Sequence, residues 1–324
     1  MIAPMRVSLV LTVLNEAGSL PAVFETLLAQ TRLADEIVIV DGGSTDGTLE
    51  LLRASRAYLP LRIIERPGAN ISQGRNAAIA AASGDVIAVT DAGVRLPPDW
   101  LEHLVAPFAD AGVSHVAGFF VSDPRTVFET ALGAATLPDV DEIRPETFAP
   151  SSRSVAFRKP VWAQAGGYPE WLDYCEDLVF DFNVQKRAGP FVFAPRACVS
   201  FRPRPTLEAF YKQYYRYARG DGKAGLFLRR HLVRYATYLV GLPLIVIGAL
   251  VVSPWVWAVG AVGAATYLAR AVRRLTRIWG AADWSEQLTM LAWLPVILAS
   301  GDVAKMLGYP AGVAWRLRNQ RPVP

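Results

Sequence analysis

The chain has 324 residues, enough for one large domain with an appendage. It is 52% hydrophobic, and much of the apolar content lies in long runs between residues 235 and 300. The formal net charge is +4, and two cysteines without a CxxC pattern and three scattered histidines exclude a disulfide framework and suggest no zinc site.

Residues 7–14 form the first apolar run. It is a buried strand rather than a signal peptide, because it stops at Asn15-Glu16, has almost no basic flank and lacks a small-residue cleavage site. A helix is predicted over residues 20–30, since its apolar residues recur on one face.

The stretch EIVIVDGGSTDGT, residues 36–48, contains a second strand buried on both faces. Asp41 ends that strand, the pair Gly42-Gly43 permits a sharp turn, and Ser44 or Asp46 can cap a helix over 48–57. A carboxylate at the carboxyl end of a parallel strand faces the crevice where open α/β sheets bind ligands. Asp41 can therefore accept the N3–H of a uracil, or it can simply cap the turn.

The alternation of strands and helices continues through residue 90. Residues 63–64 indicate a short strand, residues 72–82 a helix that carries Arg75, and residues 86–90 a strand that ends at Asp91. This order predicts an α/β fold, with a mostly parallel sheet and helices on both faces.

Three predicted strands thus end in acidic groups, namely Glu16, Asp41 and Asp91. At one sheet edge these carboxylates would repel each other unless a cation or a ligand rich in hydrogen-bond donors lies among them.

The segments SLVLTVLNEAGSL, EIVIVDGGSTDGT, GANISQGRNAAIAAASGD and VIAVTDAG resemble the successive motifs of family 2 glycosyltransferases with the GT-A fold. The resemblance covers about residues 6–220 and implies a nucleoside diphosphate sugar as donor. It implies that Glu16 and Asp41 hold the nucleoside and that Arg75 lies in the donor site. Four further residues of these motifs are assigned to substrate binding: Thr12, Asn15, Gly43 and Asp46.

Asp91 matches the first Asp of the family's DxD motif, but Gly93 stands where the second carboxylate would be. Thr12 also departs from the family pattern, which usually has Pro there. Because Mg²⁺ often uses one or two carboxylates with phosphates and water, we expect Mg²⁺ or Mn²⁺ at Asp91. Asp91 could instead bind ribose or a metal-bound water.

The sequence between residues 100 and 165 predicts further helices and strands. Helices are expected at 100–108 and 160–165, strands at 113–121 and 151–157, and a helix with a loop over 124–150 on the acceptor side.

Glu176 and Asp177 stand at the start of a helix predicted over residues 178–188. Sugar transfer needs a base near the acceptor hydroxyl, although acidic residues also favour helix N-termini for electrostatic reasons. The segment GGYPEWLDYCEDLVFDFNVQKRAG resembles the family's glycine turn and Glu-Asp element. This implies that Asp177 is the base and that Glu176 orients the acceptor or a loop, with slight crowding from Cys175.

Residues 204–234 are basic and rich in aromatic side chains. Nucleic acid is rejected as a partner because the residues that follow are membrane-like, so we expect a helix in the lipid headgroup region. The piece QYYRYARG also resembles the family's QxxRW element, which implies that Arg216 or Arg219 stabilises the leaving diphosphate. A purely interfacial anchor is the alternative.

Two uncharged runs, 235–252 and 255–269, predict a membrane hairpin, and 284–306 is a third apolar segment, broken by Pro295. Arginines flank the hairpin, whereas its turn at Ser253 carries no charge. The positive-inside rule then predicts a multi-pass protein of the cell (inner) membrane with a cytoplasmic catalytic domain. The third segment is expected to lie along the cytoplasmic leaflet.

These observations predict a GT-A domain over 1–203, an interfacial segment over 204–234 and a membrane region over 235–324. The expected function is inverting transfer of a sugar from a nucleoside diphosphate sugar to a hydroxyl of a lipid-linked or cell-envelope glycan acceptor. Two alternatives stay open: a weak pseudo-transferase acting as a membrane partner, which Gly93 permits, and a nucleotidyltransferase, against which the Glu-Asp element argues.

Overall fold

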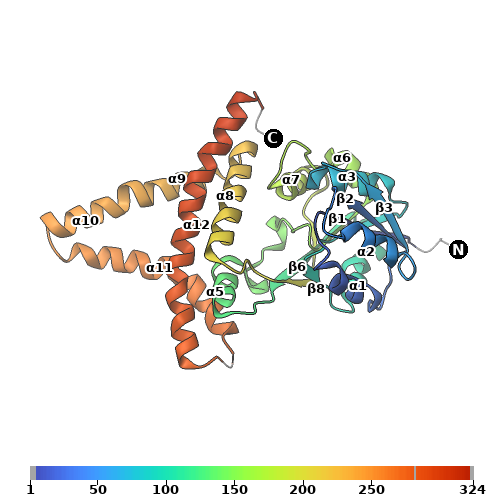
Figure 1. Cartoon of the computed structure of the whole chain (residues 1–324). Coiled ribbons are helices and arrows are strands. Elements are labelled where there is room, and N and C mark those ends of the chain that lie inside the picture. The colour runs from blue at the N-terminus through green and yellow to red at the C-terminus, as the bar shows by residue number, and fades with distance from the viewer. Residues whose placement is uncertain (1–4, 281, 322–324) are drawn as a thin grey trace. The chain divides into compact units, whose positions relative to one another are not determined.

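The computed structural model describes residues 5–280 and 282–321, which form two compact units (Figure 1). The first unit comprises the chain up to Asp123 together with Val140–Phe201 and contains the sheet. The second comprises Pro124–Asp139 and the chain from Arg202 onward, and its described elements are helices.

The sheet of the first unit has eight strands in the order β3-β2-β1-β4-β7-β6-β8-β5. Strands β1 to β4 are parallel, β7 is antiparallel to β4 and β6, and β8 is parallel to β6 and antiparallel to β5. The strands are β1 Val7–Val13, β2 Glu36–Asp41, β3 Leu61–Glu65, β4 Val86–Val89, β5 Val94–Arg95, β6 His115–Ser122, β7 Val155–Arg158 and β8 Val192–Phe201.

Helices cover both faces of this sheet, because the inner strands carry apolar residues on both sides. Leu9 of β1 packs in a core with α1, α2 and α4, and its neighbour Val10 packs in a second core with α3, α6 and α7. The helices are α1 Leu20–Leu28, α2 Thr48–Ser55, α3 Ile71–Ala81, α4 Trp100–Val105, α6 Lys159–Ala165 and α7 Glu176–Ala188. The predicted mostly parallel sheet between two helical layers is confirmed.

Three strands differ from the sequence-based expectation, and one of them, the two-residue strand β5, was not predicted. Strand β8 was not predicted, because Pro195 and Arg196 interrupt its apolar residues and several of its side chains are exposed. Strand β7 was expected over 151–157 but begins only at Val155. The residues before Val155 instead turn, with the N–H of Ser154 bonded to the carbonyl of Ser151.

The second unit is built from α5 Val127–Thr136, α8 Leu207–Ala224, α9 Leu228–Ala236, a π-helix Thr237–Gly241, α10 Leu242–Val251, α11 Val256–Ile278 and α12 Trp284–Arg318. Helices α8 and α12 lie in close backbone contact. A Cβ at Gly308 would meet the carbonyl oxygen of Tyr215 at 2.2 Å, and one at Gly312 that of Arg219 at 2.1 Å. Glycine therefore permits the approach of the two helices.

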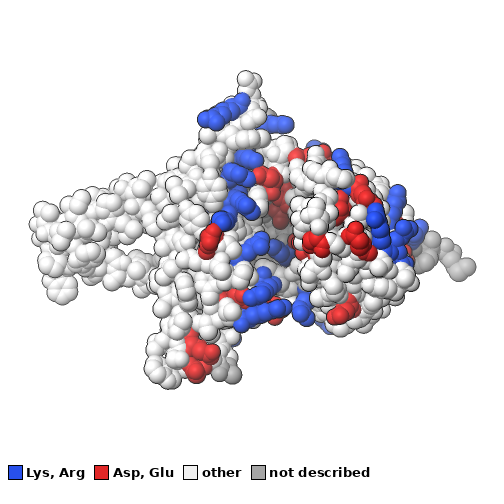
Figure 2. Space-filling view, viewed as in Figure 1, with Lys and Arg blue, Asp and Glu red and all other residues white. Residues whose placement is uncertain are grey.

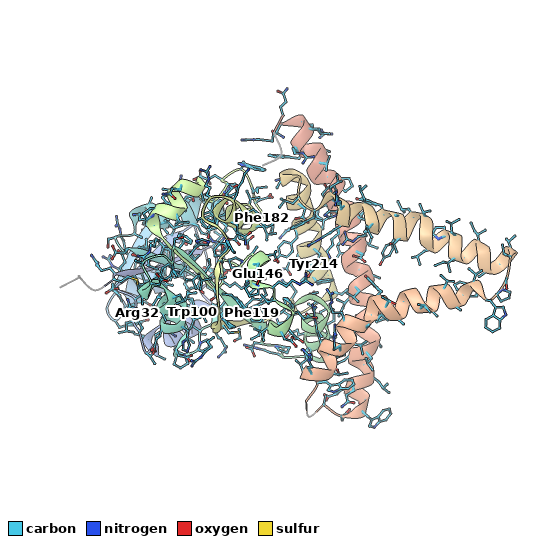
Figure 3. All side chains as sticks on the ribbon, turned by 180° about the vertical axis from the view of Figure 1, so that it is seen from behind. Arg32, Trp100, Phe119, Glu146, Phe182 and Tyr214 are labelled. Carbon is cyan, nitrogen blue, oxygen red and sulfur yellow. The ribbon has the colours of Figure 1, made fainter. Side chains whose placement is uncertain are left out.

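The arm made by α9, the π-helix and α10 runs side by side with α11, and together they project from α12 as a hairpin (Figures 1 and 3). The projecting part of this hairpin is apolar and exposed, whereas Lys and Arg gather along α8 and α12 (Figure 2). By length and composition, two helical stretches of the described chain could cross a membrane, Leu228–Val251 and Trp284–Arg318.

Helix α12 continues through both Pro295 and Pro310, so the expected break at Pro295 is wrong. An internal proline removes a backbone hydrogen bond and tends to kink a helix. Packing of α12 along α8, and against α5 and α11, holds its two halves in one helix.

Gly118 of β6 provides a test of the fold. A Cβ there would lie 2.0 Å from Ser154 Oγ and 2.5 Å from the carbonyl oxygen of Ala197, so Gly118→Ala should destabilise the first unit by roughly 1–3 kcal/mol through overpacking. Gly18→Ala is the control, because a Cβ at Gly18 would meet no atom within 4 Å outside its immediate chain neighbours. Thermal unfolding in detergent should show a lower Tm for the first variant alone, and equal Tm values would contradict this packing.

Candidate active site

The sequence-predicted acidic groups lie at one edge of the sheet. Because β1, β2 and β4 are parallel, their carboxyl ends place Glu16, Asp41 and Asp91 on the same side. The chain moves outward from β1 to β2 and β3 and then returns to place β4 on the other side of β1. The edge between β1 and β4 is thus a topological switch point, where open α/β sheets bind ligands.

Asp41 is buried and caps the turn that follows β2. Its carboxylate accepts the backbone N–H groups of Gly43 and Ser44, both at 3.1 Å, and the hydroxyl of Ser44. Gly43 has φ +101°, a conformation that favours glycine, and a Cβ there would lie 3.1 Å from Pro67 Cα. The turn-capping alternative is therefore observed, and a role of Asp41 toward a ligand stays a prediction.

The loops after β1 and β2 are joined by side-chain hydrogen bonds. Asn15 donates its N–H to Ser44 Oγ at 2.9 Å and accepts the N–H of Thr45 on its side-chain oxygen at 2.9 Å. Asp46 accepts the N–H of Ala17 at 3.1 Å and the hydroxyl of Thr48, and the latter bond holds the pKa of Asp46 below its usual range. The two loops therefore form one rim at the sheet edge.

Glu16 and Thr12 occupy different parts of this edge. Glu16 donates its N–H to Thr48 Oγ1 at 2.8 Å, and its carboxylate accepts the hydroxyl of Ser19. Thr12 faces α3, since a Cβ at Gly74 would meet Thr12 Cγ2 at 2.7 Å. Thr12 thus has a packing role beneath α3, in addition to any contact with a substrate.

Arg75 of α3 joins three separate parts of the first unit. It is 3% exposed, and its guanidinium donates to Glu176 Oε1 at 2.8 Å and to Asp91 Oδ1 at 3.0 Å. Burial disfavours the charged guanidinium, but the carboxylates of Asp91 and Glu176 outweigh it and raise the pKa of Arg75. The ring of Tyr168 lies 5.3 Å from the guanidinium carbon. Arg75 is therefore a permanent cation that fixes the start of α7 against the end of β4.

The two carboxylates of the Glu-Asp pair have different surroundings in this arrangement. Glu176 is buried and paired with Arg75, and burial together with the nearby Asp177 raises the pKa of Glu176 to about 7. Asp177 is the more exposed of the two, and its Oδ1 accepts the N–H of Leu178 at 2.9 Å. Of the two carboxylates, Asp177 is the one better placed to meet a substrate.

The glycine turn before α7 is held by Asn76 of α3. The side-chain oxygen of Asn76 accepts the N–H of Tyr168 at 2.9 Å and the indole N–H of Trp162 at 3.1 Å, and its NH₂ group donates to the carbonyl of Tyr168 at 2.8 Å. Cys175, just before α7, has φ +63°. The left-handed region costs a residue with a Cβ about 1–2 kcal/mol, so the expected crowding at this position takes the form of backbone strain.

Sequence reasoning missed two charged residues beside this cluster. Asp181 lies one helical turn after Asp177 and is 2% exposed, and burial, followed by the charge of Asp177, raises the pKa of Asp181 well above its ordinary value. The spacing of four residues on one helix was a signal for it. Arg153, just before β7, places its Nε 3.9 Å from Asp91 Oδ2, and none of the quoted motifs contained it.

The described side chains do not by themselves fit a divalent metal at Asp91. Within residues 5–280 and 282–321, no three His, Cys, Asp or Glu side chains are grouped so as to hold one. Asp91 faces two guanidinium groups, and a Cβ at Gly93 would have no neighbour within 4 Å. The metal expected from the sequence would have Asp91 as its one carboxylate.

Arg216 and Arg219, expected at the leaving diphosphate, lie on α8. That helix belongs to the second unit. Their role toward a substrate stays a prediction.

Comparison with protein families gives two matches. The family described as glycosyl transferase family 2 matches residues 8–154, and glycosyl transferase family group 2 matches residues 86–301, more than half of the chain.

Three curated relatives have transferase or polysaccharide names. The chain is 26% identical to the succinoglycan biosynthesis protein ExoA of Rhizobium meliloti, over 86% of this chain and 94% of that protein. It is 34% identical to the glycosyltransferase AglE of Haloferax volcanii, over 64% of this chain and 70% of that protein. It is 39% identical to the undecaprenyl-phosphate 4-deoxy-4-formamido-L-arabinose transferase of Yersinia pestis, over 31% of this chain and 32% of that protein.

A solved structure shares the fold. The mannosyltransferase PcManGT from Pyrobaculum calidifontis, in complex with GDP-Man and Mn²⁺, superimposes with a TM-score of 0.56 over 98% of this chain and 88% of that one, at 19% identity. This likeness confirms the expected GT-A architecture.

Asp181 gives a prediction for stability against pH. Its pKa is raised in the folded state, so the folded chain keeps a proton that the unfolded chain loses, and stability falls as pH rises above the ordinary carboxyl pKa. Asp181→Asn removes this contribution. Denaturant unfolding in detergent at a series of pH values from about 4, the ordinary carboxyl pKa, upward should show a smaller decline in the free energy of unfolding for the variant than for the wild type. Parallel curves would contradict a neutral, buried Asp181.

Proposed function

The chain is a family 2 glycosyltransferase, and we propose that it moves a sugar from a nucleoside diphosphate sugar to a hydroxyl group with inversion at the anomeric carbon. The observation that carries the proposal is that the two carboxylates at the start of α7 differ in their contact with Arg75 and in their exposure. This guanidinium engages Glu176 and Asp91, and Asp177 is the more exposed carboxylate at the start of α7.

Asp177 acts as the general base. As the acceptor oxygen forms its bond to the anomeric carbon, the bond from that carbon to the diphosphate oxygen breaks, and the hydroxyl proton passes to the Asp177 carboxylate. A carboxylate suits this role because the hydroxyl loses its proton late in the displacement. Attack opposite the leaving diphosphate in a single displacement inverts the configuration.

The donor binds at the rim formed by the loops after β1 and β2. Asn15, Glu16, Asp41 and Asp46 supply carboxylate and amide oxygens there, which suit the N–H and hydroxyl groups of a nucleoside. PcManGT, which shares the fold, was solved with GDP-Man, and this supports a sugar nucleotide as the donor class.

The acceptor is a lipid-linked or cell-envelope glycan. The names of two relatives support this choice, because one names succinoglycan biosynthesis and the other names a sugar transferase together with undecaprenyl phosphate, a lipid carrier. The pseudo-transferase alternative is less favoured, since Arg75 pairs with Glu176 and the neighbouring Asp177 is present as a carboxylate at the start of α7.

The leaving diphosphate needs positive charge as the donor bond breaks. Arg216 and Arg219 of α8 are proposed for this role because of their motif. The Mn²⁺ of PcManGT supports metal use in a protein of this fold, and here such an ion would rely on Asp91 and the donor phosphates.

The hairpin anchors the protein in a membrane. Its exposed surface is apolar, and Trp255 and Trp257 lie exposed at its tip, where amphipathic rings suit a lipid–water interface. Helix α12 runs crosswise to the hairpin (Figure 1), so if the hairpin crosses the bilayer, α12 lies along its surface. With 35 residues at ~1.5 Å each, α12 also exceeds a ~30 Å hydrocarbon core.

Asp177→Asn should remove the base while keeping its shape. We expect turnover to fall by at least ~10²-fold with nearly unchanged donor affinity. A thermal-shift screen of a panel of sugar nucleotides first identifies a donor. Release of nucleoside diphosphate from that donor then measures turnover. Glu50→Gln is a matched control, because Glu50 is an exposed carboxylate in the first turn of α2. Near-normal turnover of the Asp177 variant would refute the base assignment.

The topology can be tested by cysteine labelling in intact cells. Ser253→Cys in the hairpin turn should react with an impermeant thiol reagent, whereas Asn319→Cys after α12 should not, because the flanking arginines stay on the cytoplasmic side. The unsubstituted chain, which contains Cys175 and Cys198, gives the background. Labelling at position 319 would show that α12 crosses.

A further inference from the structure

We propose that Arg153 binds the diphosphate of the donor. Its guanidinium supplies the positive charge that a metal ion would supply if a second DxD carboxylate were present to help hold that ion. This inference rests on the proposed function and concerns the same site. It is carried by the sheet register, by the surroundings of Asp91 and by the way in which Arg153 is held.

The register of two strands places Arg153 beside Asp91. Strand β7 pairs antiparallel with β4, with Val155 opposite Val89. Arg153 lies two residues before Val155, and Asp91 lies two residues after Val89, so the same register brings them opposite each other. The hydroxyl of Thr90 donates to the carbonyl of Arg153 at 2.8 Å and extends the pairing beyond the strands.

The two oxygens of Asp91 face two different guanidinium groups. Arg75 donates to Oδ1 at 3.0 Å from a position that is 3% exposed, which leaves it little access to a ligand. Arg153 has its Nε 3.9 Å from Oδ2, longer than a hydrogen bond, and its side chain is 25% exposed. Of the two cations at Asp91, Arg153 is the one that a ligand at the sheet edge can reach.

Arg153 is also held in place. Its guanidinium carbon lies 4.3 Å from the centre of the Phe201 ring at the end of β8, and its NH1 donates to Ser151 Oγ at 3.0 Å. A guanidinium fixed by stacking presents its fork of N–H groups in one plane, the geometry that matches two phosphate oxygens. Such a group requires little reorganisation when charge develops on the leaving diphosphate.

Gly93 supplies no side chain at the position of the second DxD carboxylate. Among the described residues, Asp91 belongs to no group of three His, Cys, Asp or Glu side chains that could hold a metal ion, and the space at the Gly93 Cβ position is open. In the cluster of Asp91 and its two guanidinium groups, Arg75 is already shared with Glu176, whereas Arg153 adds a second positive charge beside Asp91. The chemistry that this cluster recognises is an anion with several oxygens, and at the switch-point edge the donor diphosphate is that anion.

The test measures binding of UDP, GDP and dTDP to the full chain in detergent, by calorimetry in excess EDTA and again with Mn²⁺. The variants are Arg153→Met, which keeps an apolar contact with Phe201, and Arg153→Lys, which keeps the charge but loses the planar fork. Arg196→Met is the matched control, because Arg196 on β8 is exposed and also lies 3.9 Å from a carboxylate, that of Asp99. Uridine, guanosine and thymidine report binding of the nucleoside alone.

We expect the wild type to bind one of the diphosphates in EDTA, and Arg153→Met to weaken that binding by about 10-fold or more, as for loss of a charged hydrogen bond. Nucleoside binding should be unchanged, Arg153→Lys should recover part of the loss, and Arg196→Met should match the wild type.

Three results would overturn the inference and leave the proposed function standing. These are diphosphate binding that is unchanged in Arg153→Met, equal weakening of nucleoside and diphosphate, which indicates a structural effect, or wild-type binding that requires Mn²⁺. If the wild type binds none of the three diphosphates under either condition, both the inference and the proposed donor class fail.

Discussion

The buried guanidinium of Arg75 is the constraint on which the site depends. A charge with 3% exposure is tolerated only when it is paired, and here two carboxylates from distant parts of the chain, Asp91 and Glu176, pair with it. Removal of either carboxylate would leave the buried guanidinium with one ion-pair partner in place of two, so the end of β4, helix α3 and the start of α7 are held as one assembly. The position of Asp177 follows from this assembly.

Much of the first unit could be predicted from its sequence. The apolar runs at β1, β2 and β4 are short, β-branched and bounded by turn residues, and each forms a strand buried on both faces. The acidic residues at their ends could be placed at one edge because parallel strands share that edge. The helix that begins at Glu176 was also predicted to within two residues.

Other features could not be read from local pattern. Strand β8 is stabilised by pairing with β6 and β5, which outweighs the poor strand propensity of Pro195 and its exposed neighbours. Arg153 acquires its place only through the β4 to β7 register, which no sequence motif encodes. The continuity of α12 through Pro295 depends likewise on tertiary packing with α8 and α5.

The rim joined by Asn15, Ser44 and Asp46 has a consequence for the thermodynamics of recognition. Its loops are tied to each other by hydrogen bonds within the protein, so their conformational entropy is lost when the chain folds rather than when a ligand arrives. A ligand that docks there meets a pre-organised surface and orders few further residues. Discrimination between ligands at this rim must then come from the fit of fixed donors and acceptors, and not from closure of a flexible loop.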